Sequence, residues 1–320
     1  MLEWLIRTFS PAVENSLRKL GAERVCALGS GFGSLLWLLL KSRRKYAAAA
    51  VLKHLALEGE GAEKSAQRIA KESFRHNGRS FAELILAPAV SHQFMKERIE
   101  IVNPDIWEAL KHHPGPGIGV TAHLGAWEIL SGIMGTDIAH KERAIVVRRQ
   151  RNQALYSRIE ALRSATGATV LGHKGVAPKV LRILKKNGLV AFLVDHNTRF
   201  AEAAFLPFLK DTAAVNIGPA LLAVRAKAAI WPIFLIHEEN GRYKYYLEEP
   251  LYTENLSGSR EEKIIAAAEY YTRAVEKYVR MFPEQWMWMH KRWKTRPAEE
   301  SPTPPGQSQG AVPDGEGVET

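Results

Sequence analysis

The 320-residue chain is 46% hydrophobic, enough for a sizeable core in one large or two small domains, and its single cysteine excludes an intrachain disulfide or a cysteine-based zinc site. The net charge is +10, and because residues 298–320 contribute −5, residues 1–297 carry +15. The strong positive charge of residues 1–297 indicates an anionic partner, which could be nucleic acid, an anionic membrane surface, or a phosphorylated or acidic substrate.

The N-terminus predicts helices that associate with a membrane. Residues 1–20 have apolar side chains at helical spacing, and residues 25–40 are almost entirely apolar before a basic cluster at 41–45. As a helix, the apolar run is about 24 Å long, shorter than the roughly 30 Å hydrocarbon layer. It could lie in the interface, enter partway or span a thinned bilayer. The alternative is a buried helix of a soluble core, but the basic cluster favours anionic headgroups on the cytoplasmic side.

Residues 46–97 predict helices, after which strands and helices alternate. This order is typical of an α/β domain with a central mixed sheet flanked by helices. The predicted strands are 118–122, 144–147, 169–171, 189–194, 229–236 and 243–247, and the predicted helices are 106–111, 127–134, 154–166, 176–186, 217–225 and 260–280.

The composition changes after Pro297, where Pro, Gly, Ser, Gln and Glu dominate without apolar periodicity. We therefore expect a membrane-associated region at 1–45, an α/β domain at 46–297 and a disordered acidic tail at 298–320. No P-loop occurs and no GxGxxG follows a strand, so neither motif suggests a nucleotide cofactor. We expect no cofactor and no metal.

The most informative strand end is the one that carries His123. The apolar run 118–122 stops there, Gly125 follows, and Glu128 begins the next helical pattern. On one straight helix the side chains of His123 and Glu128 would point about 140° apart. They can pair if Gly125 bends the backbone between them, and a carboxylate beside an imidazole suits a general base. A polar turn with a satisfied histidine is the simpler alternative.

Two further strand ends carry unusual residues, and such ends gather ligand groups in an α/β sheet. Arg148 and Arg149 follow the strand 144–147, and Asp195 follows the strand 189–194. A base, cations and a carboxylate together suit attack of an alcohol on a carbonyl near phosphate groups. The arginines could instead form a solvated basic face, and Asp195 could be a turn or helix cap.

Four segments resemble the lysophospholipid acyltransferase superfamily, and within it the bacterial lipid A biosynthesis late acyltransferases. The segment 121–128 resembles the family's HxGxWE motif, and 147–152 with 163–167 resembles its second block. Asp195 with 205–209 and 213–218 resembles its third block, and 283–297 resembles its closing PEQWxWxHRRxKTRP segment. The resemblance covers roughly residues 1–297. Departures at 149, 196, 208–210 and 215 lie around the substrate pockets.

The resemblance implies transfer of a lauroyl- or myristoyl-type chain from acyl carrier protein to a hydroxyl of a lipid A precursor of the Kdo2-lipid IVA type. It implies a place on the cytoplasmic face of the inner membrane and no nucleic-acid partner. His123 would be the general base, oriented by Glu128. The substrate-binding residues would be Arg148, Arg149, Asn152, Arg163 and Asp195. An acyl groove could be lined by Phe74, Phe81, Leu84, Ile85 and Leu86, although such a stripe is commonly plain core.

Other functions remain open on the sequence. The acceptor could be another glycolipid or a lysophospholipid, or the same His–Glu pair could act on water as a thioesterase-like hydrolase. A non-enzymatic basic membrane or nucleic-acid binding protein is a further alternative, weakened by the lack of a recognisable nucleic-acid module. Chain length and the acylated hydroxyl do not follow from the sequence.

Overall fold

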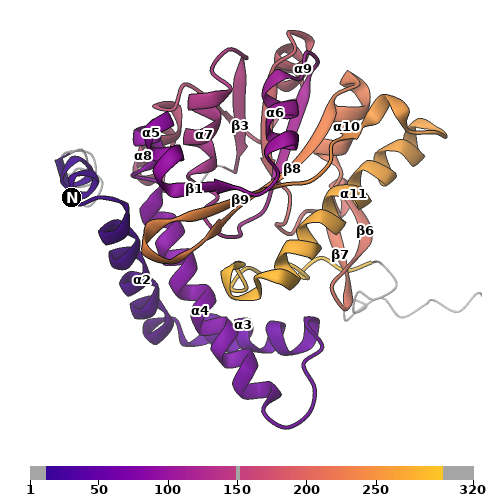
Figure 1. Ribbon diagram of the computed structural model, residues 1–320. Helices are drawn as coiled ribbons and strands as arrows, with labels where there is room; N and C mark the ends of the chain where they lie inside the picture. Colours follow the sequence, from indigo (N-terminus) through magenta and orange to yellow (C-terminus); the bar gives the residue numbers. More distant parts are fainter. Residues whose placement is uncertain (1–11, 149–151, 298–320) are drawn as a thin grey trace, which may run out of the picture.

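The computed structural model describes residues 12–148 and 152–297, and its centre is an eight-stranded mixed sheet (Figure 1). The order is β1-β9-β8-β2-β5-β3-β4, with β10 beside β8. The strands β8, β2, β5, β3 and β4 run parallel, whereas β9 is antiparallel to β8. The predicted mixed sheet flanked by helices is confirmed. The strands are β1 (Ile99–Ile101), β2 (Gly117–Thr121), β3 (Arg143–Val147), β4 (Thr169–Gly172), β5 (Leu189–Leu193), β8 (Ala229–His237), β9 (Tyr243–Leu247) and β10 (Leu251–Tyr252).

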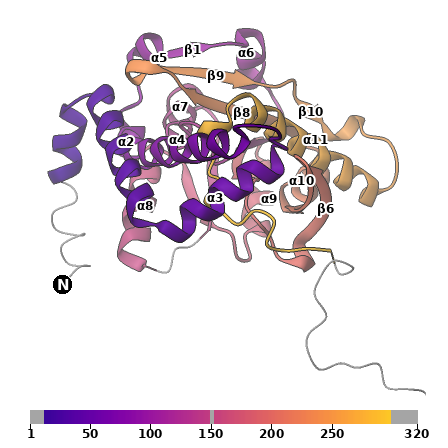
Figure 2. The same ribbon diagram turned by 90° about the horizontal axis from the view of Figure 1, so that it is seen from below.

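Helices cover both faces of this sheet, which is why every residue of the central strand β2 is buried. One face packs on α6 (Pro104–His112) and α7 (Leu130–Asp137), with α5 (His92–Arg98) and α8 (Gln153–Ser164) beside them. The other face packs on α9 (Ala177–Lys185), α10 (Gly218–Ala226) and α11 (Arg260–Met281). Seen from below in Figure 2, α5 and α6 lie on the opposite side of the molecule from α9 and α10.

Several elements were not predicted from the sequence. The hairpin β6 (Ala203–Phe208) and β7 (Asp211–Asn216) forms a separate two-stranded sheet that contacts α11. The helix predicted to begin at residue 127 begins at Leu130, so Glu128 lies in the turn before it. Short 3-10 segments are η1 (Ala87–Ala89), η2 (Phe200–Glu202), η3 (Glu239–Gly241), η4 (Thr253–Asn255) and η5 (Pro283–Gln285).

The N-terminal helices pack against the α/β domain at its lower left in Figure 1. They are α2 (Ala22–Leu39), α3 (Lys41–His54) and α4 (Ala62–Glu83). The predicted helix over residues 1–20 is helical at 12–19, and residues 1–11 lie outside the described part. α2 and α4 approach closely at glycines: a Cβ added to Gly33 would lie 2.1 Å from the Phe74 carbonyl oxygen, and one on Gly78 would lie 2.3 Å from that of Gly29.

This close approach makes Gly33 sensitive to substitution. We expect Gly33→Ala to lower the free energy of unfolding by about 1–3 kcal/mol, because the added methyl group must push α2 away from α4. Chemical denaturation measures the change. Gly31→Ala is the matched control, since a Cβ there meets nothing within 4 Å. Equal stability of the two variants would contradict the close helix contact.

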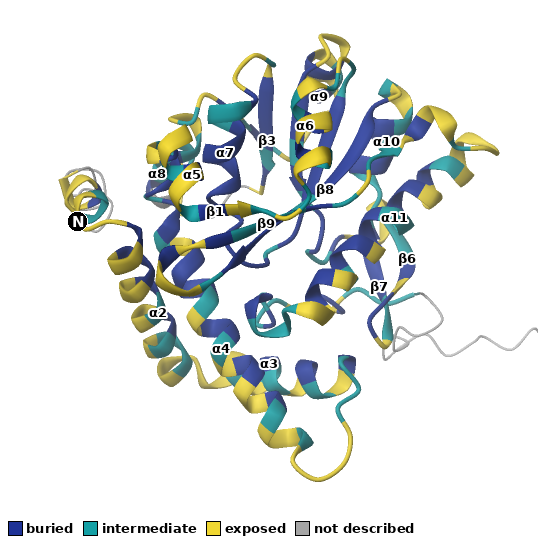
Figure 3. Ribbon diagram, in the orientation of Figure 1, coloured by how far each residue is buried: buried dark blue, intermediate teal, exposed yellow. Residues whose placement is uncertain are grey.

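The outer side of α2 is exposed (Figure 3), and it carries large apolar side chains. The stripe of Leu28, Phe32, Leu35 and Leu39 recurs at helical spacing, and each side chain is at least 48% exposed. No single helix within 12–148 and 152–297 has the length and apolar character of a membrane span. α2 and α3 meet those criteria only as a pair, bent by 98°.

Candidate active site

The register of the sheet brings two predicted site residues together. β2 pairs in parallel with β5, and Thr121 lies beside Leu193. His123 follows Thr121 by two positions, and Asp195 follows Leu193 by two. The two strands therefore deliver an imidazole and a carboxylate to the same point at their carboxyl ends.

The turn after His123 is held against the neighbouring strand β8. Gly125 has φ +62°, and a Cβ added there would lie 2.1 Å from the Leu235 carbonyl oxygen. The Ala126 N–H donates to that oxygen at 2.7 Å, and the Gly125 N–H donates to the Gln285 carbonyl at 3.2 Å. Only glycine fits at this position, and the turn is fixed from two sides.

Asp195 binds the histidine at two points. Its Oδ1 lies 2.9 Å from His123 Nδ1, and its Oδ2 accepts from the His123 backbone N–H at 2.9 Å. Oδ2 also accepts from the indole N–H of Trp286 at 2.8 Å. The carboxylate is 5% exposed, so these contacts hold it, and with it the imidazole, in one orientation.

The ionised carboxylate of Asp195 determines which ring nitrogen of His123 carries the proton. Burial disfavours the charged carboxylate, but the His123 imidazole and the hydrogen bonds from Trp286 and the backbone outweigh this and lower the pKa of Asp195 well below its usual value. An ionised carboxylate can only accept, so His123 carries its proton on Nδ1. Nε2 is left to accept a proton, and the His123 side chain is 31% exposed.

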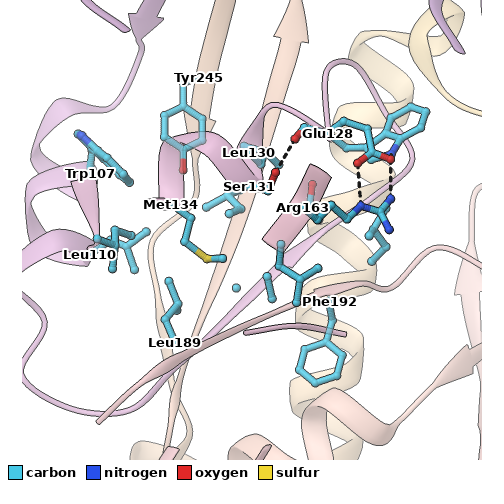
Figure 4. A pocket seen from close by; sticks show the side chains of 18 residues that line it. Trp107, Leu110, Glu128, Leu130, Ser131, Met134, Arg163, Leu189, Phe192 and Tyr245 are labelled. Carbon is cyan, nitrogen blue, oxygen red and sulfur yellow. Dashed lines mark hydrogen bonds and ion pairs between the residues drawn. The ribbon is translucent and has the colours of Figure 1, made fainter. Parts of the chain in front are cut away.

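Glu128, the predicted partner of His123, binds a different residue. Arg163 from α8 donates to Glu128 Oε2 at 3.0 Å and to Oε1 at 2.6 Å (Figure 4). The Trp127 indole N–H donates to Oε1 at 3.2 Å. No hydrogen bond joins Glu128 to His123 among the described residues, so the predicted pairing is corrected: Asp195 orients the imidazole, because Glu128 lies in the turn before α7 and is held by Arg163.

The other predicted residues occupy the rim of the site or lie apart from it. Arg148 is exposed at the end of β3, and Asn152 is exposed directly before α8. Arg149 lies outside the described residues. Arg163, predicted to bind substrate, is held by Glu128, and Arg158 forms an ion pair with Glu14. Within the described part of the chain, Arg148 is thus the predicted arginine that faces solvent beside the His123–Asp195 pair.

Sequence reasoning assigned no individual role to the residues of the closing segment 283–297. Trp286 binds Asp195, and His290 Nε2 accepts from the Asn197 N–H at 2.9 Å. Arg292 is 1% exposed and donates to the Ala214 carbonyl at 2.6 Å. This segment is rich in aromatic and basic residues. That composition could have indicated a structural role, because buried polar side chains are normally hydrogen-bonded to specific partners.

Two more histidines surround Asp195 and are neutral at physiological pH. Burial, outweighing the attraction of Asp195, lowers the pKa of both His196 and His290 to about 4. Neither of these two imidazoles therefore adds a positive charge beside His123. Among the described residues no group of three or more His, Cys, Asp or Glu side chains is arranged to hold a metal ion.

A narrow apolar pocket with a cavity volume of about 50 Å³ lies between the sheet and α6 and α7 (Figure 4). Gly119 and Ala191 form part of its floor on β2 and β5, and the Glu128–Arg163 pair lies on its wall. Trp127 joins this pocket to the site, since it lines the pocket and its ring centroid is 5.3 Å from that of His123. Its apolar lining includes Trp107, Leu110, Leu130, Met134, Leu189 and Ile233.

The predicted acyl groove does not correspond to this pocket. None of the five residues at 74, 81 and 84–86 lines it. Phe74, Leu84 and Leu86 are core residues, as the simpler alternative had it, and Phe81 is 49% exposed with its ring against Trp127. The apolar stripe on α4 serves helix packing, while the pocket is built from the sheet and from α6 and α7.

The fold and site define an α/β protein in which a carboxylate orients a histidine beside an apolar pocket. The chain belongs to the bacterial lipid A biosynthesis acyltransferases, because the model of that family matches residues 2–295. The resemblance inferred from the motifs is confirmed.

Curated relatives agree with this family. The chain is similar to the lipid A biosynthesis lauroyltransferase of Escherichia coli (strain K12), with 30% identity over 37% of this chain and 38% of that relative. It is also similar to the lipid A biosynthesis palmitoleoyltransferase of the same strain and to a lipid A biosynthesis acyltransferase of Shigella flexneri, each with 23% identity over 87% of both chains. The chain thus spans less than two thirds of the first relative and most of the other two.

Proposed function

We propose that the protein transfers a fatty acyl chain from acyl carrier protein to a hydroxyl of a lipid A precursor of the Kdo2-lipid IVA type. The observation that carries the proposal is the His123–Asp195 pair beside an apolar pocket in a member of the lipid A acyltransferase family. The family supports acyl transfer in lipid A biosynthesis. The donor, the acceptor hydroxyl and the precursor are part of the proposal.

His123 acts as the general base in this reaction. Its Nε2 takes the proton of the acceptor hydroxyl while the hydroxyl oxygen attacks the thioester carbonyl. Asp195 holds the ring and stabilises the imidazolium that forms. The tetrahedral intermediate then breaks its C–S bond, and the departing sulfur takes the proton from Nε2. An ester and a free thiol result, and the imidazole returns to its neutral form.

The apolar pocket holds the acyl chain. Each methylene group that leaves water there contributes about 0.8 kcal/mol to binding, and the cavity of about 50 Å³ must widen to admit a long chain. Glu128 and Arg163 join the turn before α7 to α8 and so support the wall of the pocket. Arg148, exposed at the rim, binds an anionic group of the acceptor. In this proposal Glu128 and Arg163 are positioning residues.

The protein works at the cytoplasmic face of the inner membrane. The exposed stripe of Leu28, Phe32, Leu35 and Leu39 would enter the apolar part of the interface. The basic residues at 41–45, directly after it, would meet anionic headgroups. The bend of 98° between α2 and α3 suits a surface attachment or a partial entry.

This membrane attachment can be tested without deleting α2, which packs on α4 and is part of the fold. We expect Leu28→Gln/Leu35→Gln/Leu39→Gln to reduce binding to anionic phospholipid vesicles by at least 100-fold, since three exposed leucines lose their burial in lipid. Flotation with vesicles measures it. The control Phe200→Gln changes an apolar side chain that is 56% exposed elsewhere. Undiminished binding of the triple variant would refute the assignment of this stripe.

The role of Asp195 has its own prediction. Asp195→Asn should lower kcat for acyl transfer by about 10²–10⁴-fold with the fold retained, because the new amide can donate to His123 Nδ1 and move the ring proton to Nε2. Initial rates of ester formation measure it. Asp211→Asn is the control, a carboxylate paired with Lys53 and Arg296. A rate for Asp195→Asn within threefold of the unmodified protein would contradict the proposed pair.

A further inference from the structure

The outer face of α9 carries four cations that the fold does not use for packing. Its inner side, with Val180, Ile183 and Leu184, is buried against the sheet. Lys179, Arg182, Lys185 and Lys186, at the outer side and the end of this helix, are exposed. Since Lys179, Arg182 and Lys186 are spaced by three and four residues, they form one stripe along the helix. These four residues are called the α9 basic face.

The protein itself leaves this face largely unneutralised. The sequence has no acidic residue between Glu160 and Asp195. Lys186 lies 3.1 Å from Glu142, while the other three cations form no ion pair among the described residues. Like charges this close repel one another, so their arrangement favours a partner that brings negative charge.

The α9 basic face begins at the carboxyl edge of the sheet and runs toward the opposite edge, where Lys186 contacts Glu142 before β3. α9 follows β4, so its first turn lies at the same carboxyl edge of the sheet as the ends of β3 and β5. In the connecting loop, Lys174 and Arg148 both lie close enough to His173 to lower its pKa, after the effect of burial. The basic surface therefore extends from α9 to the rim beside Asp195.

A membrane is a poor partner for this face. Helices that bind a bilayer surface place large apolar side chains beside their cations. No large apolar side chain of 169–188 is among the strongly exposed ones, whereas α2 has a whole stripe of them. In Figure 1, α9 lies at the top of the molecule and α3 at the bottom. An acidic protein fits these features better.

We infer that the α9 basic face, with Lys174, is the docking surface for the acidic acyl carrier protein that delivers the donor thioester. This inference rests on the proposed function. Opposite charges guide the carrier protein to the edge of the sheet where its thioester must reach His123. Binding here leaves the exposed stripe of α2 free for the membrane, so donor and acceptor approach from different sides.

The test is a charge reversal with a matched control. Lys179→Glu/Arg182→Glu changes two exposed positions of α9, and Arg68→Glu/Lys71→Glu makes the same change, at the same spacing, on the exposed side of α4. We expect the α9 variant to raise KM for acylated carrier protein at least tenfold and to lose most of its dependence on salt. Transfer from acyl-pantetheine, which has no protein surface, should be unchanged. The α4 variant should match the unmodified protein with both donors.

Three outcomes separate the possibilities. A change in KM of less than twofold for the α9 variant, or an equal rise with acyl-pantetheine, would overturn the docking surface. No transfer by the unmodified protein from either donor would refute the proposed function instead. In that case titration calorimetry with the carrier protein still decides, since binding weakened at least tenfold by the α9 variant alone supports the surface and equal binding refutes it. Lys179→Arg/Lys185→Arg should behave as the unmodified protein, because it keeps the charge.

Discussion

Replacing His123 by alanine should lower the rate of acyl transfer by about 10²–10⁴-fold while the protein stays folded. The imidazole is the group that accepts the hydroxyl proton, and its Nε2 is the one ring nitrogen that Asp195 leaves available. The side chain is 31% exposed and contributes little to the core, so stability should change little. Steady-state kinetics with acylated carrier protein and a lipid A precursor measure the rate, and thermal unfolding measures the fold.

A matched histidine provides the control for this variant. His112 has a side chain that is 80% exposed at the end of α6, next to Glu108. We expect His112→Ala to retain full activity. If His123→Ala kept more than a third of the normal rate, His123 would not be the base. Partial recovery of the variant by added imidazole would further identify the missing group.

Replacing Glu128 by alanine should lower the free energy of unfolding by about 3–5 kcal/mol, because it leaves the Arg163 guanidinium largely buried without its carboxylate. The Arg163 side chain is 16% exposed, so water can compensate only in part. Activity should fall with the loss of structure in the turn before α7 and in α8. Chemical denaturation of the purified variant measures the stability.

A double variant separates the two possible roles of Glu128. Glu128→Ala/Arg163→Met removes both charges, so we expect it to regain much of the lost stability. A Glu128→Ala protein that kept its stability but lost acyl transfer would instead support a direct action of Glu128 on His123. That result would restore the pairing first predicted from the spacing.

The sequence could predict which strand ends carry reactive side chains. His123, Arg148 and Asp195 each follow an apolar run, and the structure places all three at the carboxyl edge of the sheet. It could not predict the partner of His123. That choice depends on strand order, because β5 lies directly beside β2 and brings residue 195 next to residue 123. Glu128 is nearer in sequence, but Arg163 from another helix binds it.

Other features depended on contacts that no local pattern reveals. The acyl groove was predicted on α4 because its apolar residues recur at helical spacing, a pattern that core packing produces equally well. The pocket instead has Gly119 and Ala191 on its floor, small residues that leave space between the sheet and α7. The β6–β7 hairpin was missed because Pro207 lies within β6 and Leu209 occupies a positive-φ position in the turn, where hairpins usually have Gly, Asn or Asp.

Mass spectrometry of the acceptor tests the central claim most directly. Purified protein is incubated with acylated carrier protein and Kdo2-lipid IVA, and both the lipid and the carrier thiol are quantified. We predict that the acceptor gains the mass of one acyl chain, that one thiol appears for each ester formed, and that His123→Ala shows neither. Thiol release with free fatty acid and an unchanged acceptor would contradict acyl transfer and identify a hydrolase.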